Sequence, residues 1–361
     1  MAEETRPWRL MTLEEARSRI PERTLPGFWC GGLARLDEHL AAVQAGEVST
    51  MGTSPGGRPI RLVAYGERES AGGKANFNSA VAAREPSAYM DRASRTKPVV
   101  FFVGPVHGHE VEGLTGLVNL MHVMETGADL RGRPQDELRA LAERCRLLIL
   151  PTGNPDGLAR FEPGTLQGLE GDDIRFWGQG TWSDGRLCGW PQCKRVHPMR
   201  ADQVSFLGCY YDDAGVNPMH DEFTRAMSAS APAILDVARR EGPDLTAVLH
   251  SSGHAPHFGR PAYTPLAVQE HVRALYRVFQ ARLEPLGIPS GGAPEPRPEG
   301  GEFPASLNLT GMLYHVCGGV PFTFECPHGV RTDRVRLLGL EEILEVQLAL
   351  YCSMLEFALS R

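Results

Sequence analysis

The sequence predicts an α/β fold: a three-layer sandwich in which a mixed central sheet carries helices on both faces. Short, continuous apolar runs alternate along the chain with stretches of helical periodicity, which is the pattern of such a sandwich. The apolar runs are rich in β-branched and aromatic residues, as is typical of strands that are buried on both faces. The chain has 361 residues, of which 42% are hydrophobic and 22% charged, and is therefore long enough to bury a sizeable core.

The first part of the chain begins with a short helical segment, about residues 1–47. Apolar residues at helical spacing predict helices within it over 12–17 and 33–43. A turn-rich stretch then leads into the first expected strand, residues 60–65. Buried strands and helices are expected to follow at 98–103 (strand), 111–124 (helix), 135–143 (helix) and 146–151 (strand).

The second part of the chain repeats this alternation after a long irregular stretch. Residues 158–220 are rich in Gly, Trp, Cys and Asp and have no clear periodicity, so we interpret them as a loop insertion rather than a separate domain. A Pro- and Gly-rich loop is expected over 289–301. We therefore expect a single domain over residues 1–361. Its remaining elements are a helix at 221–240, strands at 245–250 and 322–324, and a helix at 339–359.

The composition argues against several classes of partner. Lys and Arg number 37 and Asp and Glu 44, so the net charge of −7 disfavours a nucleic acid or an anionic membrane as the main partner. No run of 18 apolar residues occurs, and the first ten residues do not resemble an export signal, so we expect a cytoplasmic location. The eight cysteines are expected to be reduced thiols, and the close pair Cys188 and Cys193 is too isolated to predict a metal site. The oligomeric state is left open.

Two familiar catalytic patterns are excluded by their details. Residues 52–56 have the G-x-S-x-G pattern of serine hydrolases, but Pro55 follows the serine and has no N–H to donate to an oxyanion. A strand also follows these residues, where that type of nucleophile needs a helix. His109 and Glu110 begin like H-E-x-x-H, but Gly113 stands where the second histidine is needed. No phosphate-binding G-x-x-x-x-G-K-[ST] loop occurs either.

A stretch of polar residues after the strand 98–103 is the first part of a candidate site. His107 lies just past the carboxyl end of this strand, where open α/β sheets bind ligands. Glu110 follows three residues later, on the same side of a helical turn, so that both side chains can reach one metal ion. The alternative pair His109 and Glu112 has the same spacing but is disfavoured, because both residues then move into the helix.

Two further strand ends supply the rest of the candidate site. His250 ends one expected strand, and Glu325 directly follows another. Two His and one Glu are the ligand set of hydrolytic zinc sites, which leave the fourth position to water. The remaining Glu suits the general base that such water needs. We therefore expect His107, Glu110 and His250 to bind one Zn²⁺ per chain and Glu325 to act as the general base.

At these residues the sequence resembles the zinc carboxypeptidases of the carboxypeptidase A type, as a divergent, bacterial-like member. The resemblance covers about residues 30–360 and implies the fold of that family. It also implies that Tyr314, in a segment similar to the family's tyrosine-bearing stretch, lines the substrate pocket, although Tyr314 lies unusually close to Glu325 in the chain. The matched segments are G-x-S-x-x-G-R-P-I at 52–60, H-G-x-E-x-x-G at 107–113, N-P-D-G at 154–157 and T-F-E at 323–325.

The sequence departs from this family where the substrate is bound. An Asn-Arg pair normally holds the substrate carboxylate, but Met219 and His220 stand at those positions. We expect His220 and the nearby Asn217 to be substrate-binding residues, with His220 as a weaker anion ligand or in another role. The family also has an arginine after its N-P-D-G turn that stabilises the oxyanion. The candidates for it are Arg175, Lys194 and Arg195, of which we prefer Arg195.

The sequence thus predicts a zinc-dependent hydrolase that cleaves an amide bond in a peptide or small amide substrate. The resemblance favours a carboxypeptidase. A deacylase or amidase of small N-acyl amino acids is the alternative, because the expected carboxylate clamp is altered. A catalytically silent binding protein on the same fold is the remaining alternative. The presence of Glu325 counts against it, since a protein without catalysis needs no general base.

Overall fold

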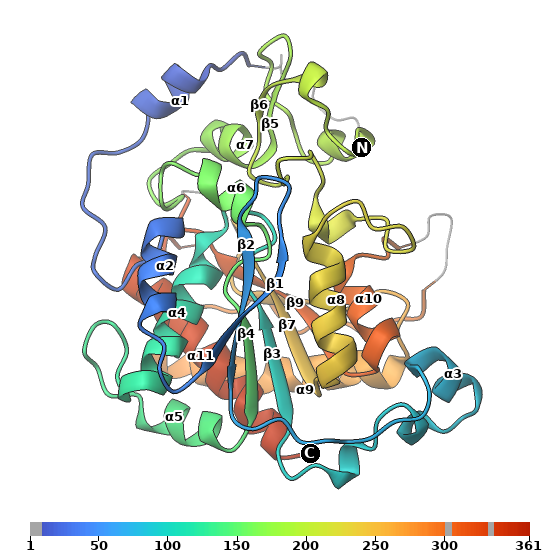
Figure 1. Cartoon of the computed structure of the whole chain (residues 1–361). Coiled ribbons are helices and arrows are strands. Elements are labelled where there is room, and N and C mark those ends of the chain that lie inside the picture. The colour runs from blue at the N-terminus through green and yellow to red at the C-terminus, as the bar shows by residue number, and fades with distance from the viewer. Residues whose placement is uncertain (1–8, 300–304, 331–335) are drawn as a thin grey trace.

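The computed structural model of the chain describes residues 9–299, 305–330 and 336–361. Its centre is a seven-stranded mixed sheet with the strand order β1-β2-β4-β3-β7-β9-β8 (Figure 1). The four central strands are parallel, whereas the strands at both edges pair antiparallel. The strands are β1 (Glu47–Thr53), β2 (Pro59–Tyr65), β3 (Val99–Val103), β4 (Arg146–Leu150), β7 (Leu245–Ser252), β8 (His257–Gly259) and β9 (Val320–Pro327).

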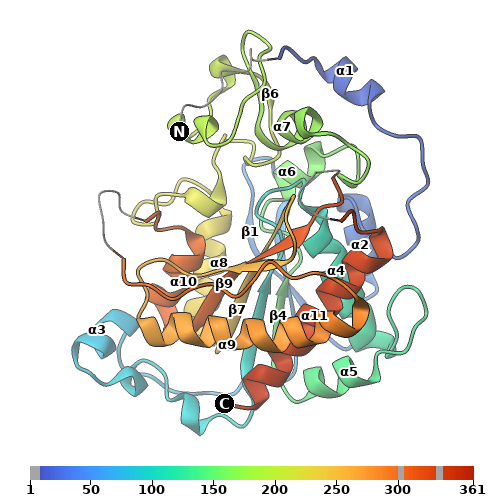
Figure 2. The same ribbon diagram turned by 180° about the vertical axis from the view of Figure 1, so that it is seen from behind.

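Helices cover both faces of this sheet, so the predicted fold class is confirmed (Figures 1 and 2). Successive side chains of a strand point to opposite faces of the sheet, so the sheet divides the core into two halves. Phe102 of β3 packs in one half and its neighbour Phe101 in the other. The half that contains Phe102 includes residues of α2 (Leu33–Ala41), α4 (Val111–Thr126), α5 (Asp136–Glu143), α9 (Leu266–Leu283) and α11 (Leu340–Leu359). The half that contains Phe101 includes residues of α3 (Phe77–Ala82), α8 (Ser230–Glu241) and α10 (Leu309–Cys317).

Several elements differ from the sequence-based expectation. The helix expected over 221–240 begins only at Ser230, because the carboxylate of Asp221 accepts hydrogen bonds from the backbone N–H groups of Met227 and Ser228 and holds a turn there. His250 and Glu325 lie within β7 and β9 rather than at or beyond their ends, since these strands continue to Ser252 and Pro327. The structure also contains elements that are not predicted from the sequence, namely β1, α3, β8, α9 and α10. The helix expected over 12–17 is present as α1 (Leu13–Ser18).

The stretch 158–220 is more ordered than a loop insertion. It follows from α6 (Pro155–Arg160) into α7 (Gly171–Gln179) and a small antiparallel pair, β5 (Gly180–Trp182) and β6 (Val204–Leu207). It also has a small core of its own, formed by Cys188, Cys193, Met199 and Tyr211. The stretch thus contains elements that the sequence pattern does not show, among them strands of three or four residues, which are too short for a periodicity; its interpretation as an insertion stays a prediction.

The structure also bears on two expectations from the composition, the reduced state of the cysteines and the lack of a membrane-spanning helix. All eight cysteines are buried and free, as the sequence predicts. Burial raises the pKa of the Cys188 thiol to about 12, so this side chain behaves as a small apolar residue rather than as a metal ligand. Among the described residues, no helix is long and apolar enough to cross a membrane.

Candidate metal centre

The three residues expected as ligands, His107, Glu110 and His250, converge at the carboxyl ends of β3 and β7. Their donor atoms all lie within 4.8 Å of one another, and all three side chains are buried. Nδ1 of His107 is 2.9 Å from Oε1 of Glu110, and Nδ1 of His250 is 2.9 Å from Oε2 of Glu110. Within the sheet, β4 follows β3 towards one edge, whereas β8 and β9 follow β7 towards the other edge. The three residues therefore lie at the topological switch point, where the strand order reverses.

The donor set and its surroundings fit a zinc ion. The two Nδ1 atoms of His107 and His250 lie 3.2 Å apart and share the Glu110 carboxylate. The Nε2 atoms of both histidines are buried and have no hydrogen-bond partner within the described part of the chain, whereas both Nδ1 atoms face Glu110, so Nδ1 is the atom that each ring offers to the common centre. Two imidazole nitrogens and one carboxylate are the protein ligands of hydrolytic zinc sites.

Two glycines set this geometry by allowing close contacts of the backbone. A Cβ on Gly108 would lie 2.0 Å from the carbonyl carbon of Gly157, so the turn that carries the first two ligands packs against the N-P-D-G turn only without a side chain. A Cβ on Gly113 would lie 2.8 Å from Cβ of Leu249. Helix α4 therefore lies directly on β7, which brings Glu110 to the third ligand. This explains both glycines of the H-G-x-E-x-x-G pattern.

Electrostatics favour the metal-binding form of Glu110. Burial alone would raise the pKa of Glu110, but attraction to His107 and His250 and their hydrogen bonds outweigh it and lower this pKa well below its usual range. Glu110 is therefore a carboxylate. Burial lowers the pKa of His107, which favours the neutral ring that binds metals. Burial acts in the same direction on His250, but attraction to Glu110 and its hydrogen bond outweigh it and raise the pKa.

Glu325 lies beside the ligands on the neighbouring strand. In the parallel pair of β7 and β9, Glu325 and His250 are Cα partners. Burial raises the pKa of Glu325 to about 7, while the charges of His250 and Glu110 act on it in opposite directions. A carboxyl group with a pKa near neutrality both accepts and returns a proton easily, which is what a general base in hydrolysis has to do.

The alternative pair His109 and Glu112 does not form a site. The ring of His109 lies 5.0 Å from that of Tyr210, and burial lowers its pKa to about 3. Oε2 of Glu112 accepts a hydrogen bond of 2.5 Å from the hydroxyl of Ser251 in the protein interior. The two side chains thus have separate partners, and the pair His107 and Glu110 is the one that the fold brings to His250.

Tyr210 is a residue of this site that the sequence does not reveal. Its ring stacks on that of His107, with 4.0 Å between the ring centroids and 28° between the planes. Burial, followed by the charge of Glu110, raises the pKa of the phenol well above its usual value, so the hydroxyl stays protonated. Tyr210 follows β6 in a stretch without periodicity or motif, so the sequence contains no signal for it.

Lys194 is the candidate cation that reaches the neighbourhood of the ligands. Its Nζ is 2.8 Å from Nε2 of His220, which ends a short 3-10 helix over Pro218–His220. Burial and then the charge of Lys194 lower the pKa of His220 to about 3, so the neutral ring accepts a hydrogen bond from the ammonium group. The same charge acts on His107 and His250.

The other two candidate cations have different surroundings. Arg195, which we preferred on the sequence, is exposed, as is Lys194 itself. Arg175 lies on α7, with its Nη1 3.8 Å from Oδ1 of Asp172. The structure therefore gives the contact with His220 to Lys194, and the choice of Arg195 remains a prediction.

Two further residues expected to bind substrate have structural contacts, and their substrate-binding role stays a prediction. The ring of Tyr314 lies on α10 and packs edge-on against Phe77 of α3, with ring centroids 5.8 Å apart. The helix α10 leads into the amino end of β9, whereas Glu325 lies towards the carboxyl end of this strand. Asn217 is buried, and its Oδ1 accepts a hydrogen bond from the backbone N–H of Met219. Asn217 thus shapes the turn that carries His220.

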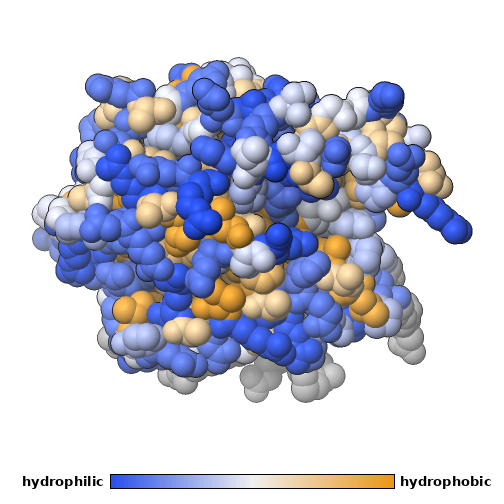
Figure 3. Space-filling view, turned by 90° about the horizontal axis from the view of Figure 1, so that it is seen from below, coloured by the Kyte–Doolittle hydropathy of each residue, from blue (hydrophilic) through white to orange (hydrophobic). Residues whose placement is uncertain are grey.

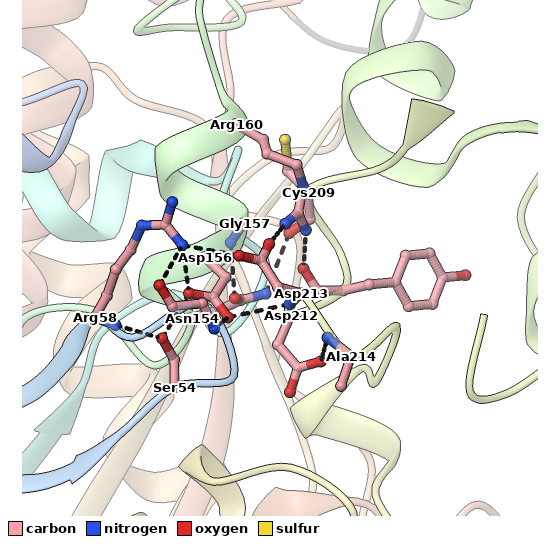
Figure 4. Close-up of polar contacts among 12 residues, drawn as sticks. Ser54, Arg58, Asn154, Asp156, Gly157, Arg160, Cys209, Asp212, Asp213 and Ala214 are labelled. Atoms are coloured by element: carbon pink, nitrogen blue, oxygen red, sulfur yellow. Dashed lines mark hydrogen bonds and ion pairs between the residues drawn. The ribbon is translucent and has the colours of Figure 1, made fainter. Parts of the chain in front are cut away.

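The N-P-D-G turn is tied into the fold by Asp156, which has no exposed surface (Figure 4). Its carboxylate accepts hydrogen bonds from the hydroxyl of Ser54 at 2.5 Å and from Nη1 of Arg58 at 2.8 Å. The backbone N–H groups of Gly56 and Asp213 donate to it at 3.0 and 3.1 Å. Ser54, the serine of the G-x-S-x-G pattern, therefore has a structural partner and joins the β1–β2 hairpin to the turn behind the metal centre.

Comparison with known proteins agrees with this geometry. Residues 38–255 match the model of the zinc carboxypeptidase family. Among solved structures, a metallo-carboxypeptidase from Burkholderia cenocepacia is similar with a TM-score of 0.54 and 16% identity, over 91% of this chain and 69% of that one. Bovine thrombin-activatable fibrinolysis inhibitor, solved with tick carboxypeptidase inhibitor, is similar with a TM-score of 0.55 and 12% identity, over 92% and 97% of the two chains.

The carboxypeptidase A from Helicoverpa armigera is also similar, with a TM-score of 0.51 and 13% identity over 96% of this chain and 79% of that one. At such identities these likenesses show the fold alone. A search of curated protein sequences finds no match to the chain.

Proposed function

The chain belongs to the zinc carboxypeptidase family, and on this premise we propose that it is a zinc-dependent hydrolase that cleaves an amide bond in a peptide or small amide. The observation that carries the proposal is the convergence of His107, Glu110 and His250, with Glu325 paired to His250 on the next strand. A protein that only binds a ligand on this fold has no use for a half-buried carboxyl group beside the candidate metal ligands, so Glu325 supports an enzyme.

The residues of the site have distinct roles in this proposal. His107, Glu110 and His250 hold one zinc ion, which when bound polarises a carbonyl group and lowers the pKa of water. The carboxylate of Glu325 accepts a proton from the attacking water and returns it to the nitrogen of the leaving amine. Tyr210 holds the ring of His107 by stacking on it and presents a protonated hydroxyl.

The cation beside the site bears on the class of substrate. The ammonium group of Lys194, held by His220, is a point charge and pairs with a carboxylate without the two-pronged geometry of an arginine. A free carboxylate close to the scissile amide is a feature both of a peptide C-terminus and of a small N-acyl amino acid. Lys194 in the neighbourhood of the ligands, together with His220 where the family has an arginine, is the observation that favours a deacylase or amidase as the second candidate function.

Metal analysis followed by a substrate panel tests the proposal. We expect one zinc per purified chain and hydrolysis within a panel of peptides and N-acyl amino acids. His107→Ala and His250→Ala are expected to lose the zinc, whereas His122→Ala, further along α4, keeps it. Unchanged zinc in either ligand variant would refute the ligand assignment. Zinc-loaded protein that cleaves no member of the panel would refute the enzyme.

A further inference from the structure

A cavity of about 510 Å³ lies at the amino ends of β3, β7 and β9, at the opposite end of the sheet from the metal centre. Its wall contains Pro98, Asp244 and Val320, which stand at or next to the first residues of these strands. The remaining wall comes from the segment before β3 and from the ends of α5 and α11. Figure 3 shows the molecule from this end, where hydrophilic side chains surround smaller apolar patches.

Positive charge is concentrated in this cavity. Its wall contains a single carboxylate side chain, that of Asp244, among the described residues. The chain as a whole has a net charge of −7, so the local charge is opposite in sign to that of the protein. The cationic side chains of the wall are Arg92, Arg95, Lys97, Arg144 and Arg361.

The one carboxylate does not neutralise even the two arginines closest to it. Nη2 of Arg95 lies 2.8 and 2.7 Å from the two oxygens of Asp244, and Nε of Arg92 lies 3.2 Å from one of them. The side chain of Arg95 is only 4% exposed, and its buried Nε has no hydrogen-bond partner among the described residues. Burial lowers the pKa of Arg95 and outweighs the charges of Asp244 and Glu69, which act to raise it.

Backbone carbonyl groups hold these two arginines in place. Nη2 of Arg92 donates to the carbonyl of Cys317 at 2.7 Å, and Nη1 of Arg95 donates to that of Gly242 at 3.1 Å. This part of the wall is therefore formed before any ligand arrives, which lowers the entropic cost of binding. The volume of the cavity lies within the range of about 300–1,000 Å³ that is typical of small-molecule sites.

We propose that this cavity binds a small phosphate-bearing anion, with Arg92 and Arg95 as a fixed positive wall and Lys97 and Arg144 as flexible contacts. Phosphate fits this wall because several cations can share its oxygens and because guanidinium groups match its geometry. Arg144 is exposed, and Nζ of Lys97 donates one hydrogen bond of 3.2 Å to the carbonyl of Glu143 as its sole contact of this kind in the described ranges, so both side chains are available to a ligand.

Calorimetric titration of the full chain with inorganic phosphate tests the proposal. Sodium chloride at matched ionic strength is the control for screening, and succinate is the control for a carboxylate dianion. We expect one phosphate per chain, bound more tightly than succinate. The double variant Lys97→Ala/Arg144→Ala is expected to bind phosphate about tenfold or more weakly, since two charge-assisted contacts are lost. Arg92 and Arg95 are not replaced, because they also donate hydrogen bonds to backbone carbonyl groups and their loss would disturb the fold.

A matched control removes two exposed cations elsewhere, Arg186→Ala/Arg200→Ala, and is expected to change the affinity less than about twofold. Equal loss in both double variants, or no loss in Lys97→Ala/Arg144→Ala, would overturn the proposal, as would heats no larger than those of chloride. Equal affinity for succinate would overturn phosphate as the ligand class. Zinc content is measured in the same samples, so failure of this inference is separate from failure of the proposed hydrolase.

Discussion

His250 and Glu325 are Cα partners in the parallel pair of β7 and β9, which places a candidate metal ligand and the candidate general base side by side on neighbouring strands. Successive side chains of a strand alternate between the two faces of a sheet, so a shift of β9 by one residue would move Glu325 to the other face. The register of these two strands therefore determines whether the site can be catalytic.

Replacement of Glu325 tests its role as the base. Glu325→Gln is expected to keep its zinc and to lose about 10²–10⁴-fold in kcat/KM, because an amide cannot accept a proton from water. Zinc analysis and steady-state kinetics on the best substrate measure the two effects. Glu270→Gln, on the exposed face of α9, is the matched control and is expected to change neither. Loss of zinc in Glu325→Gln would make this residue a ligand instead.

Replacement of Lys194 tests whether its charge recognises a substrate carboxylate. Lys194→Met removes the ammonium group and keeps the length of the side chain. We expect kcat/KM to fall about tenfold or more for a substrate with a free carboxylate and to change little for the same substrate capped as an amide. Arg195→Met serves as the control and is expected to leave the ratio of the two substrates within about twofold. The opposite result would restore Arg195 as the relevant cation.

The close approach of Gly113 to Leu249 predicts that zinc binding is sensitive to a single methyl group. Gly113→Ala is expected to destabilise the protein by about 1–3 kcal/mol, because the added Cβ pushes α4 away from β7. Zinc affinity is expected to fall as well, since Glu110 then moves away from His250. Thermal unfolding and competition with a chelator measure the two effects. Gly171→Ala, at the start of α7 where a Cβ meets no atom within 4 Å, is the control and is expected to be neutral.

From the lowered pKa of Asp156 we predict how the free energy of unfolding depends on pH. Burial alone would raise the pKa of Asp156, but hydrogen bonds, that of Ser54 first, outweigh it and lower this pKa below its ordinary value of 3.8. The contribution of the carboxylate is then fully present above its ordinary pKa and is lost as the pH falls through the lowered one. Asp156→Asn is expected to cost about 3 kcal/mol at pH 7.

This cost is expected to start shrinking below about pH 4, where the carboxyl group of the unfolded chain takes up a proton while that of the folded protein stays ionised, and to shrink until the pH has passed through the lowered pKa. Urea unfolding at pH 7, 5 and 3 measures the difference between the two proteins. Asp37→Asn, on the exposed side of α2, is expected to show no such change. A difference between wild type and Asp156→Asn that stays constant down to pH 3 would contradict the lowered pKa.

The candidate ligands can be predicted from the sequence because their signals are local. His107 and Glu110 are three residues apart, and His250 and Glu325 each follow a short apolar run that is recognisable as a buried strand. In a parallel sheet the carboxyl ends of neighbouring strands meet at one edge, so the pattern alone predicts that these residues come together.

The residues around the ligands cannot be predicted in this way. Lys194 and Tyr210 reach the site through the stretch 158–220, whose path is set by the packing of its small core, and no periodicity records that packing. Tyr314 is assigned to the pocket by the resemblance alone, and this assignment stays a prediction. In the structure its ring packs against Phe77, and Leu309 and Leu313 bury one side of its helix in the core. A motif does not record packing of this kind.

The spacing of the ligands along the chain has a consequence for folding. Glu110 and His250 are separated by 140 residues, and they meet only after β3 and β7 have paired. Contacts between such distant parts of a chain form late, because the entropy of closing a long loop must be overcome first. A chain emerging from the ribosome therefore has no complete candidate site until residue 250 has left the exit tunnel. With zinc bound as we propose, its release during denaturation would report the separation of two central strands rather than the melting of one turn.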